Sequence, residues 1–156
     1  MSHLQTLFDG AGEQIPLMFA EDGCLCAPMW HGITEDGEPV FTITPWENQE
    51  EKLKQIESVR ERFKRQKVVA YISVSEAWTL STATEEEARA WAGRVSEHPD
   101  GREVIVIQGE DISGRQMMGV FHILRPEHGP ATLSPFHLQE DCEAVPMKDN
   151  MVGWLS

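Results

Sequence analysis

The sequence predicts an α+β fold in which a mainly antiparallel sheet carries one long amphipathic helix on one face. Residues 45–66 place apolar side chains at helical spacing, and residues 68–80 and 103–124 read as strands with short turns. Strands joined by such turns pair with their sequence neighbours, so we expect antiparallel pairing. The 156 residues fit a single domain, residues 1–156.

Glycine interrupts the N-terminal part of the chain. We expect a short helix over residues 2–8, ended by Gly10 and Gly12, and then extended chain over residues 15–30. The extended part is expected to lead into the first strands of the sheet.

A hairpin is predicted next. Residues 24–27 should form a strand. Because Pro28 has no backbone N–H, the end of this strand is expected to lie at a sheet edge or a bulge. Residues 35–38 have the composition of a hairpin turn, and residues 40–43 supply the returning strand. The sequence therefore predicts an antiparallel pair here.

The helix over residues 45–66 has the clearest local signals. Thr44 is placed to cap it, Pro45 suits the first helical position, and Glu47 closes a capping box. Seven of the thirteen basic residues lie in residues 52–67, and those at the helix end complement its dipole. The apolar stripe consists of Trp46, Leu53, Ile56, Val59 and Phe63.

A long strand and a short helix should follow. The even positions of residues 68–80 are apolar except Glu76, so this face should be buried, whereas the face that carries Tyr71 should be partly exposed. Thr84 and Glu87 form a second capping box, which opens a short helix over residues 85–92.

The last strands form a second hairpin. Residues 104–107 are continuously apolar, as expected of a central strand covered on both faces. Residues 117–124 return antiparallel to it, and residues 131–136 add a short edge strand. From Gln139 onward we expect an acidic and irregular tail.

The formal charge of −13 is unevenly distributed, because residues 1–51 contain ten acids and no Lys or Arg. An acidic surface repels phosphate backbones and anionic lipids, so neither a nucleic-acid nor a membrane partner is expected. No apolar run approaches the roughly 18 residues of a membrane span, and no secretory leader is recognisable. Three cysteines do not make a disulfide scaffold. We therefore expect a soluble, cytoplasmic protein.

Residues 68–115, about a third of the chain, resemble an uncharacterised family of small bacterial and phage-associated proteins. The resemblance rests mainly on Val74-Ser75-Glu76-Ala77-Trp78, the loop Ser96-Glu97-His98-Pro99-Asp100, and Glu110-Asp111 with Gly114. It brings no activity or catalytic residue with it. It implies that the central strands are a recurring unit.

Glu76 is the main candidate for catalytic chemistry. A carboxylate on a buried strand face has its neutral form favoured, which is one way to make a general acid. His98, Asp100, Glu110 and His122 are the available partners. The alternative is that the strand end is exposed, or that Glu76 accepts a structural hydrogen bond from Trp78 or an arginine.

Cys24 and Cys26 are weak candidates for a metal site, because residues two apart on a strand face the same side. The sequence has no strong zinc spacing, and buried cysteine packs as a small hydrophobe, so core packing is favoured and no cofactor is expected. A surface on which tryptophans stack against a carbohydrate or a nucleobase would need several tryptophan side chains on one exposed face. Trp46, Trp78 and Trp91 are expected to be buried, which leaves Trp30 and Trp154.

The leading functional hypothesis is a non-catalytic binding or assembly protein that forms a homo-oligomer through a sheet face or edge. An unidentified protein partner is also compatible with this hypothesis. The first alternative is a small hydrolase or metal-dependent enzyme that uses Glu76 with His98, Asp100 or His122. The second is an acidic inhibitor that imitates nucleic acid.

Overall fold

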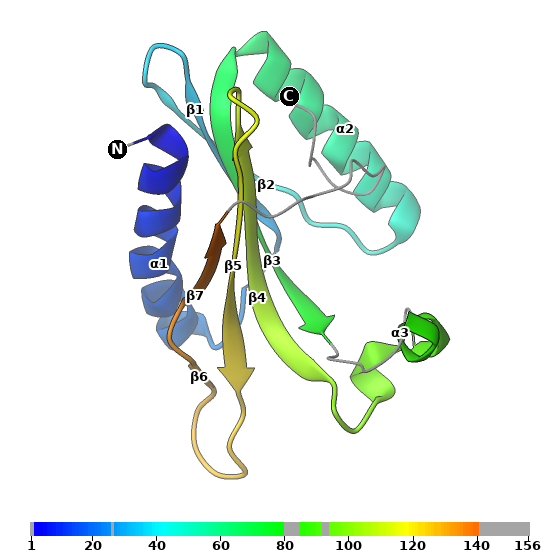
Figure 1. Ribbon diagram of the computed structural model, residues 1–156. Helices are drawn as coiled ribbons and strands as arrows, with labels where there is room; N and C mark the ends of the chain where they lie inside the picture. The colour runs from blue at the N-terminus through cyan, green and yellow to red at the C-terminus, as the bar shows by residue number, and fades with distance from the viewer. Residues whose placement is uncertain (1, 26, 80–84, 92–93, 141–156) are drawn as a thin grey trace.

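A curled antiparallel sheet with a helix against each face organises the chain (Figure 1). The computed structural model describes residues 2–25, 27–79, 85–91 and 94–140. The strands are β1 (Met29–Thr34), β2 (Pro39–Ile43), β3 (Val68–Thr79), β4 (Arg102–Asp111), β5 (Gln116–Leu124), β6 (Thr132–Leu133) and β7 (His137–Glu140). The helices are α1 (His3–Asp22), α2 (Gln49–Arg65) and α3 (Glu85–Trp91), with a 3-10 turn at Val95–Glu97.

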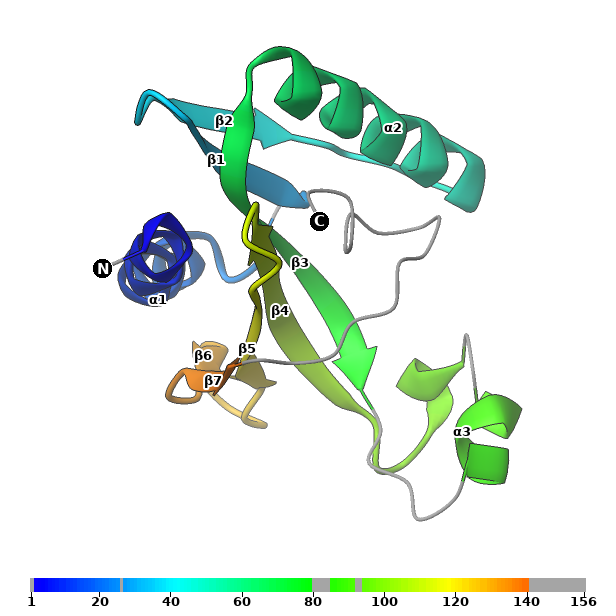
Figure 2. The same cartoon turned by 45° about the horizontal axis from the view of Figure 1, so that its top comes forward.

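The strand order is β2-β1-β3-β4-β5-β6, and β7 also pairs with β5. All of these pairs are antiparallel. The predicted α+β class and the antiparallel sheet are therefore confirmed. Figure 2 shows α1 and α2 on opposite sides of the sheet, each with its own hydrophobic cluster.

Helix α1 is much longer than predicted. It runs from His3 to Asp22 through Gly10 and Gly12, so the predicted stop and the extended chain over residues 15–22 are wrong. Burial of its apolar face outweighs the roughly 1 kcal/mol that each internal glycine costs. The buried residues of that face are Leu4, Leu7, Phe8, Ala11, Ile15 and Phe19.

Helix α1 ends at Asp22 and is capped by Gly23, which has a φ of 72° and donates its N–H to the Phe19 carbonyl at 2.7 Å. The strand expected at residues 24–27 is wrong for Cys24, Leu25 and Ala27, because β1 begins at Met29, and Cys26 lies outside the described residues. The predicted turn at residues 35–38 and the returning strand are confirmed, and Gly32 lies opposite Val40 in the hairpin.

Helix α2 confirms the predicted amphipathic helix but begins later, at Gln49. Asn48 is its N-cap and accepts a hydrogen bond from the Glu51 N–H, so the cap assigned to Thr44 is wrong. Thr44 is instead buried, and its hydroxyl accepts a hydrogen bond of 2.7 Å from the Trp30 indole N–H. The α2 side of the core consists of Trp30, Val40, Ile56, Val59, Phe63, Val68 and Tyr71.

We expect Thr44→Val to lower the free energy of unfolding by about 1–3 kcal/mol, because it leaves the buried Trp30 N–H without its acceptor. Urea unfolding followed by tryptophan fluorescence measures the change. Thr44→Ser keeps the hydroxyl and should recover most of the stability. Equal losses for serine and valine would contradict the importance of this hydrogen bond.

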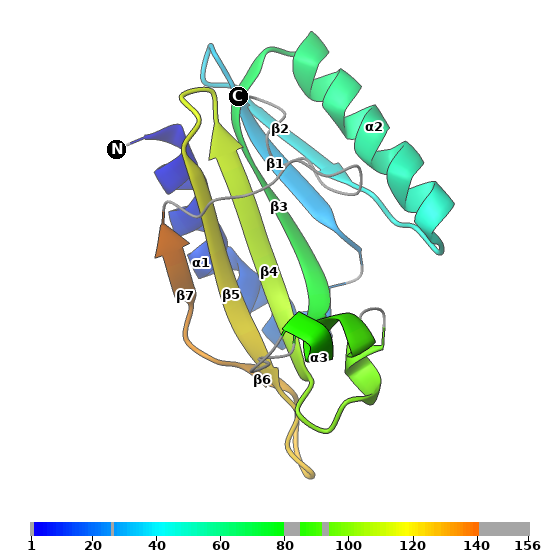
Figure 3. The same ribbon diagram turned by 45° about the vertical axis from the view of Figure 1, so that its right-hand side comes forward.

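Strand β3 is the longest strand and changes environment along its length (Figure 3). Its first half pairs with β1 up to Val74 opposite Met29, and β3 then continues past the start of β1. Tyr71 is buried because α2 covers it, contrary to the expected partial exposure. Beyond β1, Glu76 is exposed and Trp78 is 46% exposed, so the expected burial of this end is wrong.

The C-terminal strands agree with the sequence up to β6. The β4–β5 hairpin and the short edge strand β6 are confirmed, and β4 is central. Strand β7 was not predicted, so the irregular tail expected from Gln139 is wrong for residues 139–140. These residues lie opposite Met118 and Met117 of β5. The rest of the tail lies outside the described residues. The short helix expected at 85–92 is confirmed as α3, with residue 92 also outside them.

Candidate functional site

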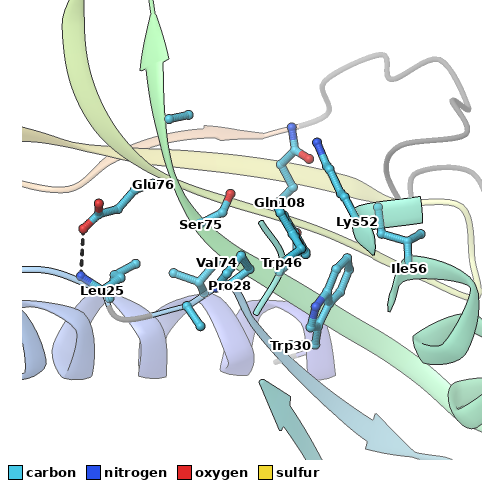
Figure 4. Close-up of a pocket in the computed structure, with 13 residues that line it drawn as sticks. Leu25, Pro28, Trp30, Trp46, Lys52, Ile56, Val74, Ser75, Glu76 and Gln108 are labelled. Carbon is cyan, nitrogen blue, oxygen red and sulfur yellow. Dashed lines mark hydrogen bonds between the residues drawn. The ribbon is translucent and has the colours of Figure 1, made fainter. Parts of the chain in front are cut away.

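Glu76 lies at the rim of a cleft of about 500 Å³ between the exposed end of β3, the first half of α2 and the connector residues Leu25, Ala27 and Pro28 (Figure 4). Its carboxylate accepts a hydrogen bond of 2.7 Å from the Leu25 N–H. This contact joins the connector after α1 to β3. Glu76 is therefore exposed, as the alternative interpretation anticipated, and not a buried acid. Its hydrogen-bond donor is the Leu25 N–H, and not the expected Trp78 or an arginine.

The cleft combines aromatic and polar walls. Figure 4 shows Trp30 and Trp46 on the side of α2, with Lys52 and Gln108 near them and Glu76 directed towards Leu25. Lys52 lies 5.6 Å from the centre of the Trp46 ring, within the range of a cation–π contact. The cleft can thus hold polar groups of a ligand, with one ammonium and one carboxylate at separate places.

His98 and Asp100 belong to a loop that packs on α3. The His98 ring lies edge-on to Trp91 at 4.5 Å, and its Nε2 is 3.4 Å from a Glu87 carboxylate oxygen. Its Nδ1 accepts a hydrogen bond of 2.9 Å from the Asp100 N–H. These contacts give His98 a structural role in holding the loop to α3.

His122 lies on the other face of the sheet from Glu76. It is opposite Val104 on β4, whereas Glu76 is opposite Ile105, and neighbouring residues of a strand face opposite sides. His122 lines a separate depression of about 420 Å³ together with His137. Among the described residues, no hydrogen bond or ion pair joins Glu76 to His98, Asp100 or His122. None of the four candidate partners His98, Asp100, Glu110 and His122 lines the cleft at whose rim Glu76 lies.

Cys24 does not lie on a strand. Cys24 is half-buried in the connector between α1 and β1, and Cys26 lies outside the described residues. Within the ranges that the structure describes, no group of three or more His, Cys, Asp or Glu residues could hold a metal ion.

The tryptophans are distributed differently from expectation. Trp30, expected to be free, is buried, whereas Trp78, expected to be buried, is exposed. Trp46 and Trp91 are half-buried, and Trp154 lies outside the described residues. Trp30 and Trp46 line one cleft together, and the Trp30 N–H is already bonded to Thr44.

A second and more apolar cavity, which we name the α1 groove, lies between α1 and the β1–β2 hairpin. It has a volume of about 620 Å³. Its chief lining residues are Leu7, Gly10, Ala11, Gln14, Ile15 and Met18 of α1, with Met29, His31, Ile33, Pro39 and Phe41 of the hairpin. The sequence interpretation missed this groove because it ended the first helix at residue 8. The apolar spacing of α1 was the signal that could have revealed it.

The outer edge of β2 borders the α1 groove. The Thr34 N–H donates to the Glu38 carbonyl and the Thr44 N–H donates to the Pro28 carbonyl, each at 2.9 Å. Because every second residue of an antiparallel strand bonds to the same neighbour, Glu38, Val40, Thr42 and Thr44 direct their backbone groups towards β1. The N–H and C=O groups of the intervening Phe41 and Ile43 therefore point away from β1. Their side chains are 51% and 53% exposed.

None of the helices in the described part of the chain is both long and apolar enough to cross a membrane. The chain matches no protein-family model, no curated protein and no solved structure. The geometry of the α1 groove and of the β2 edge is therefore the basis on which a function can be proposed.

Proposed function

We propose that the protein is a non-catalytic binding and assembly protein that forms a homodimer through the outer edge of β2. The observation that carries this proposal is the combination of outward-pointing backbone groups and large exposed apolar side chains at Phe41 and Ile43. In the described chain β2 is a terminal strand of the sheet, paired with β1 alone. Such an edge is a template for another strand.

A second copy of the chain fits this edge because β2 can pair with itself. In an antiparallel pair with its two-fold axis at Thr42, Phe41 of one copy lies opposite Ile43 of the other. Each such pair exchanges N–H···O bonds in both directions, since both residues direct their backbone groups outward. The exposed apolar side chains then lie side by side on one face of a continuous sheet.

One contact must give way for this pairing. Arg62 of α2 donates a hydrogen bond of 3.4 Å to the Phe41 carbonyl. The bond is long and exposed, so a backbone N–H from a second copy can replace it at small cost. Each chain carries a charge of −13, so added salt should strengthen the dimer by screening the repulsion.

We expect Ile43→Pro to weaken the dimer by about tenfold or more, because proline removes an outward N–H that the β1–β2 hairpin does not use. Size-exclusion chromatography with light scattering over a range of concentrations measures the dissociation constant. Ile43→Glu should have the same effect by placing a charge at the interface.

Ile112→Glu is the matched control for Ile43→Glu, because Ile112 is 65% exposed in the β4–β5 turn and the charge change is identical. It should dimerise like the unmodified protein. A monomeric unmodified protein, or equal dissociation of the Ile43 and Ile112 variants, would refute the proposed interface.

A further inference from the structure

We propose that the α1 groove binds a small amphiphilic molecule, an aliphatic chain with one oxygen-containing head group that hydrogen-bonds to His31. The cavity of about 620 Å³ falls within the roughly 300–1,000 Å³ of small-molecule sites. The groove is lined by one chain alone, so this inference goes beyond the proposed dimer and does not depend on it.

The walls of the groove define the chemistry of the chain-like part of the ligand. No residue that lines it carries a full charge, and most of its exposed lining is apolar. Leu7, Ile15 and Met29 are buried at its base, while Met18 and Phe41 are exposed at its rim. A charged or sugar-like group placed along these apolar walls would lose its hydration without replacement, whereas an aliphatic chain gains by leaving water.

His31 defines the position of the head group. Its imidazole is half-buried and has no hydrogen-bond or ion-pair partner in the part of the chain that the structure describes. Its ring contacts Phe41 edge-on at a centroid distance of 6.1 Å. The other polar side chains lining the groove are Thr6 and Gln14 of α1. The imidazole is thus a donor and acceptor in apolar surroundings, which a ligand oxygen would satisfy.

The groove can be filled without disturbing the fold. Gly10 lines it, and a Cβ atom added there would meet no heavy atom within 4 Å. Gly10→Leu therefore places a side chain in the groove and also favours the helix. Ala20→Leu is the matched control, because Ala20 is exposed on the same helix and does not line the groove.

The experiment titrates the unmodified protein and both variants with decanoic acid and with 1-decanol, by isothermal titration calorimetry below the micellar concentration. We expect saturable binding of at least one probe to the unmodified protein and to Ala20→Leu, and a loss of about tenfold or more in Gly10→Leu. Dissociation constants of about 1 mM or weaker for both probes, or unchanged binding to Gly10→Leu, would overturn the site. Thermal melting of Gly10→Leu verifies that it is folded.

The role of His31 has a separate readout. Burial lowers the pKa of His31 in the free protein, and a bound carboxylate would raise it, so decanoate binding should take up a proton. Its affinity should therefore increase as the pH falls through the titration range of histidine, while that of 1-decanol should not. His31→Leu should lower the affinity for whichever probe binds the unmodified protein, and should remove any pH dependence of that affinity. Unchanged affinity in His31→Leu would refute the assignment of the head group.

Discussion

Gly109→Ala should destabilise the protein by about 3 kcal/mol, because the added methyl group has no room in the centre of the sheet. Gly109 lies in β4 between Ile72 of β3 and Met117 of β5. A Cβ atom there would be 2.5 Å from the Tyr71 carbonyl oxygen and 2.9 Å from side-chain carbons of Ile72 and Leu4. The oxygen belongs to the backbone of a paired strand, so the clash cannot be relieved by a side-chain rotation.

The control is the same substitution at Gly10, where a Cβ atom meets nothing. Gly10→Ala should raise the stability by about 0.5–1 kcal/mol, since alanine loses less backbone entropy in a helix. Urea unfolding of both variants measures the two free energies. A Gly109→Ala protein as stable as the unmodified one would show that β3 and β4 are not packed as closely as described.

The second large effect concerns a buried polar pair between the sheet and α2. Glu110 of β4 is fully buried and lies directly opposite Tyr71 of β3. Its carboxylate accepts a hydrogen bond of 2.9 Å from the Tyr71 hydroxyl. The Tyr71 ring in turn packs on Phe63 of α2 at a centroid distance of 5.6 Å. The pair thus connects the two central strands to the helix.

We expect Tyr71→Phe to cost about 1–3 kcal/mol of stability, because it removes one donor from a buried carboxylate while keeping the aromatic ring. Urea unfolding at neutral pH measures the loss. Glu110→Gln should be milder, since the amide oxygen can still accept the Tyr71 hydroxyl bond. A Tyr71→Phe variant of unchanged stability would contradict the importance of this bond.

Because of the same pair, the stability of the protein is expected to fall with rising pH in the alkaline range. Burial, and then the nearby charge and hydrogen bond of Glu110, raise the pKa of Tyr71 well above its ordinary value of 10.0. Above pH 10 the unfolded chain therefore loses this proton while the folded chain keeps it, so this group makes the stability fall as the pH rises. Below pH 10 the contribution of Tyr71 is fully present.

Tyr71 is the only tyrosine of the chain, so the near-ultraviolet absorbance of tyrosinate reports this group alone. We expect tyrosinate to appear only as the protein unfolds, with circular dichroism and absorbance changing together. Ionisation near pH 10 in protein that is still folded would contradict the buried pair. In Tyr71→Phe the tyrosine-linked part of the alkaline loss of stability should be absent.

The sequence predicted those helices and strands whose formation depends on local residue patterns. The apolar spacing of α2 and the tight turns of the two hairpins were sufficient to place them, and they are observed. Gly10 and Gly12 predict a local end for the first helix, but α1 continues through them because Leu4, Phe8 and Ile15 pack on the sheet. Tertiary burial thus overrode local propensity at this helix.

The candidate sites depend still more on tertiary structure. Glu76 was identified as unusual from the alternation of β3, but its exposure follows from the place where β1 begins, which the strand pattern of β3 does not contain. His31 and Phe41 line the α1 groove only because α1 extends across the hairpin. The open edge of β2 was foreseeable only as one of several possible edges of the sheet.

Native mass spectrometry of protein purified without chelator, compared with its mass under denaturing conditions, tests the proposed self-association most directly. We expect a dimer of two 17.6 kDa chains for the unmodified protein and a monomer for Ile43→Pro at the same concentration. An unmodified protein that remains monomeric at every concentration, or a dimer that persists in Ile43→Pro, would contradict assembly through the edge of β2.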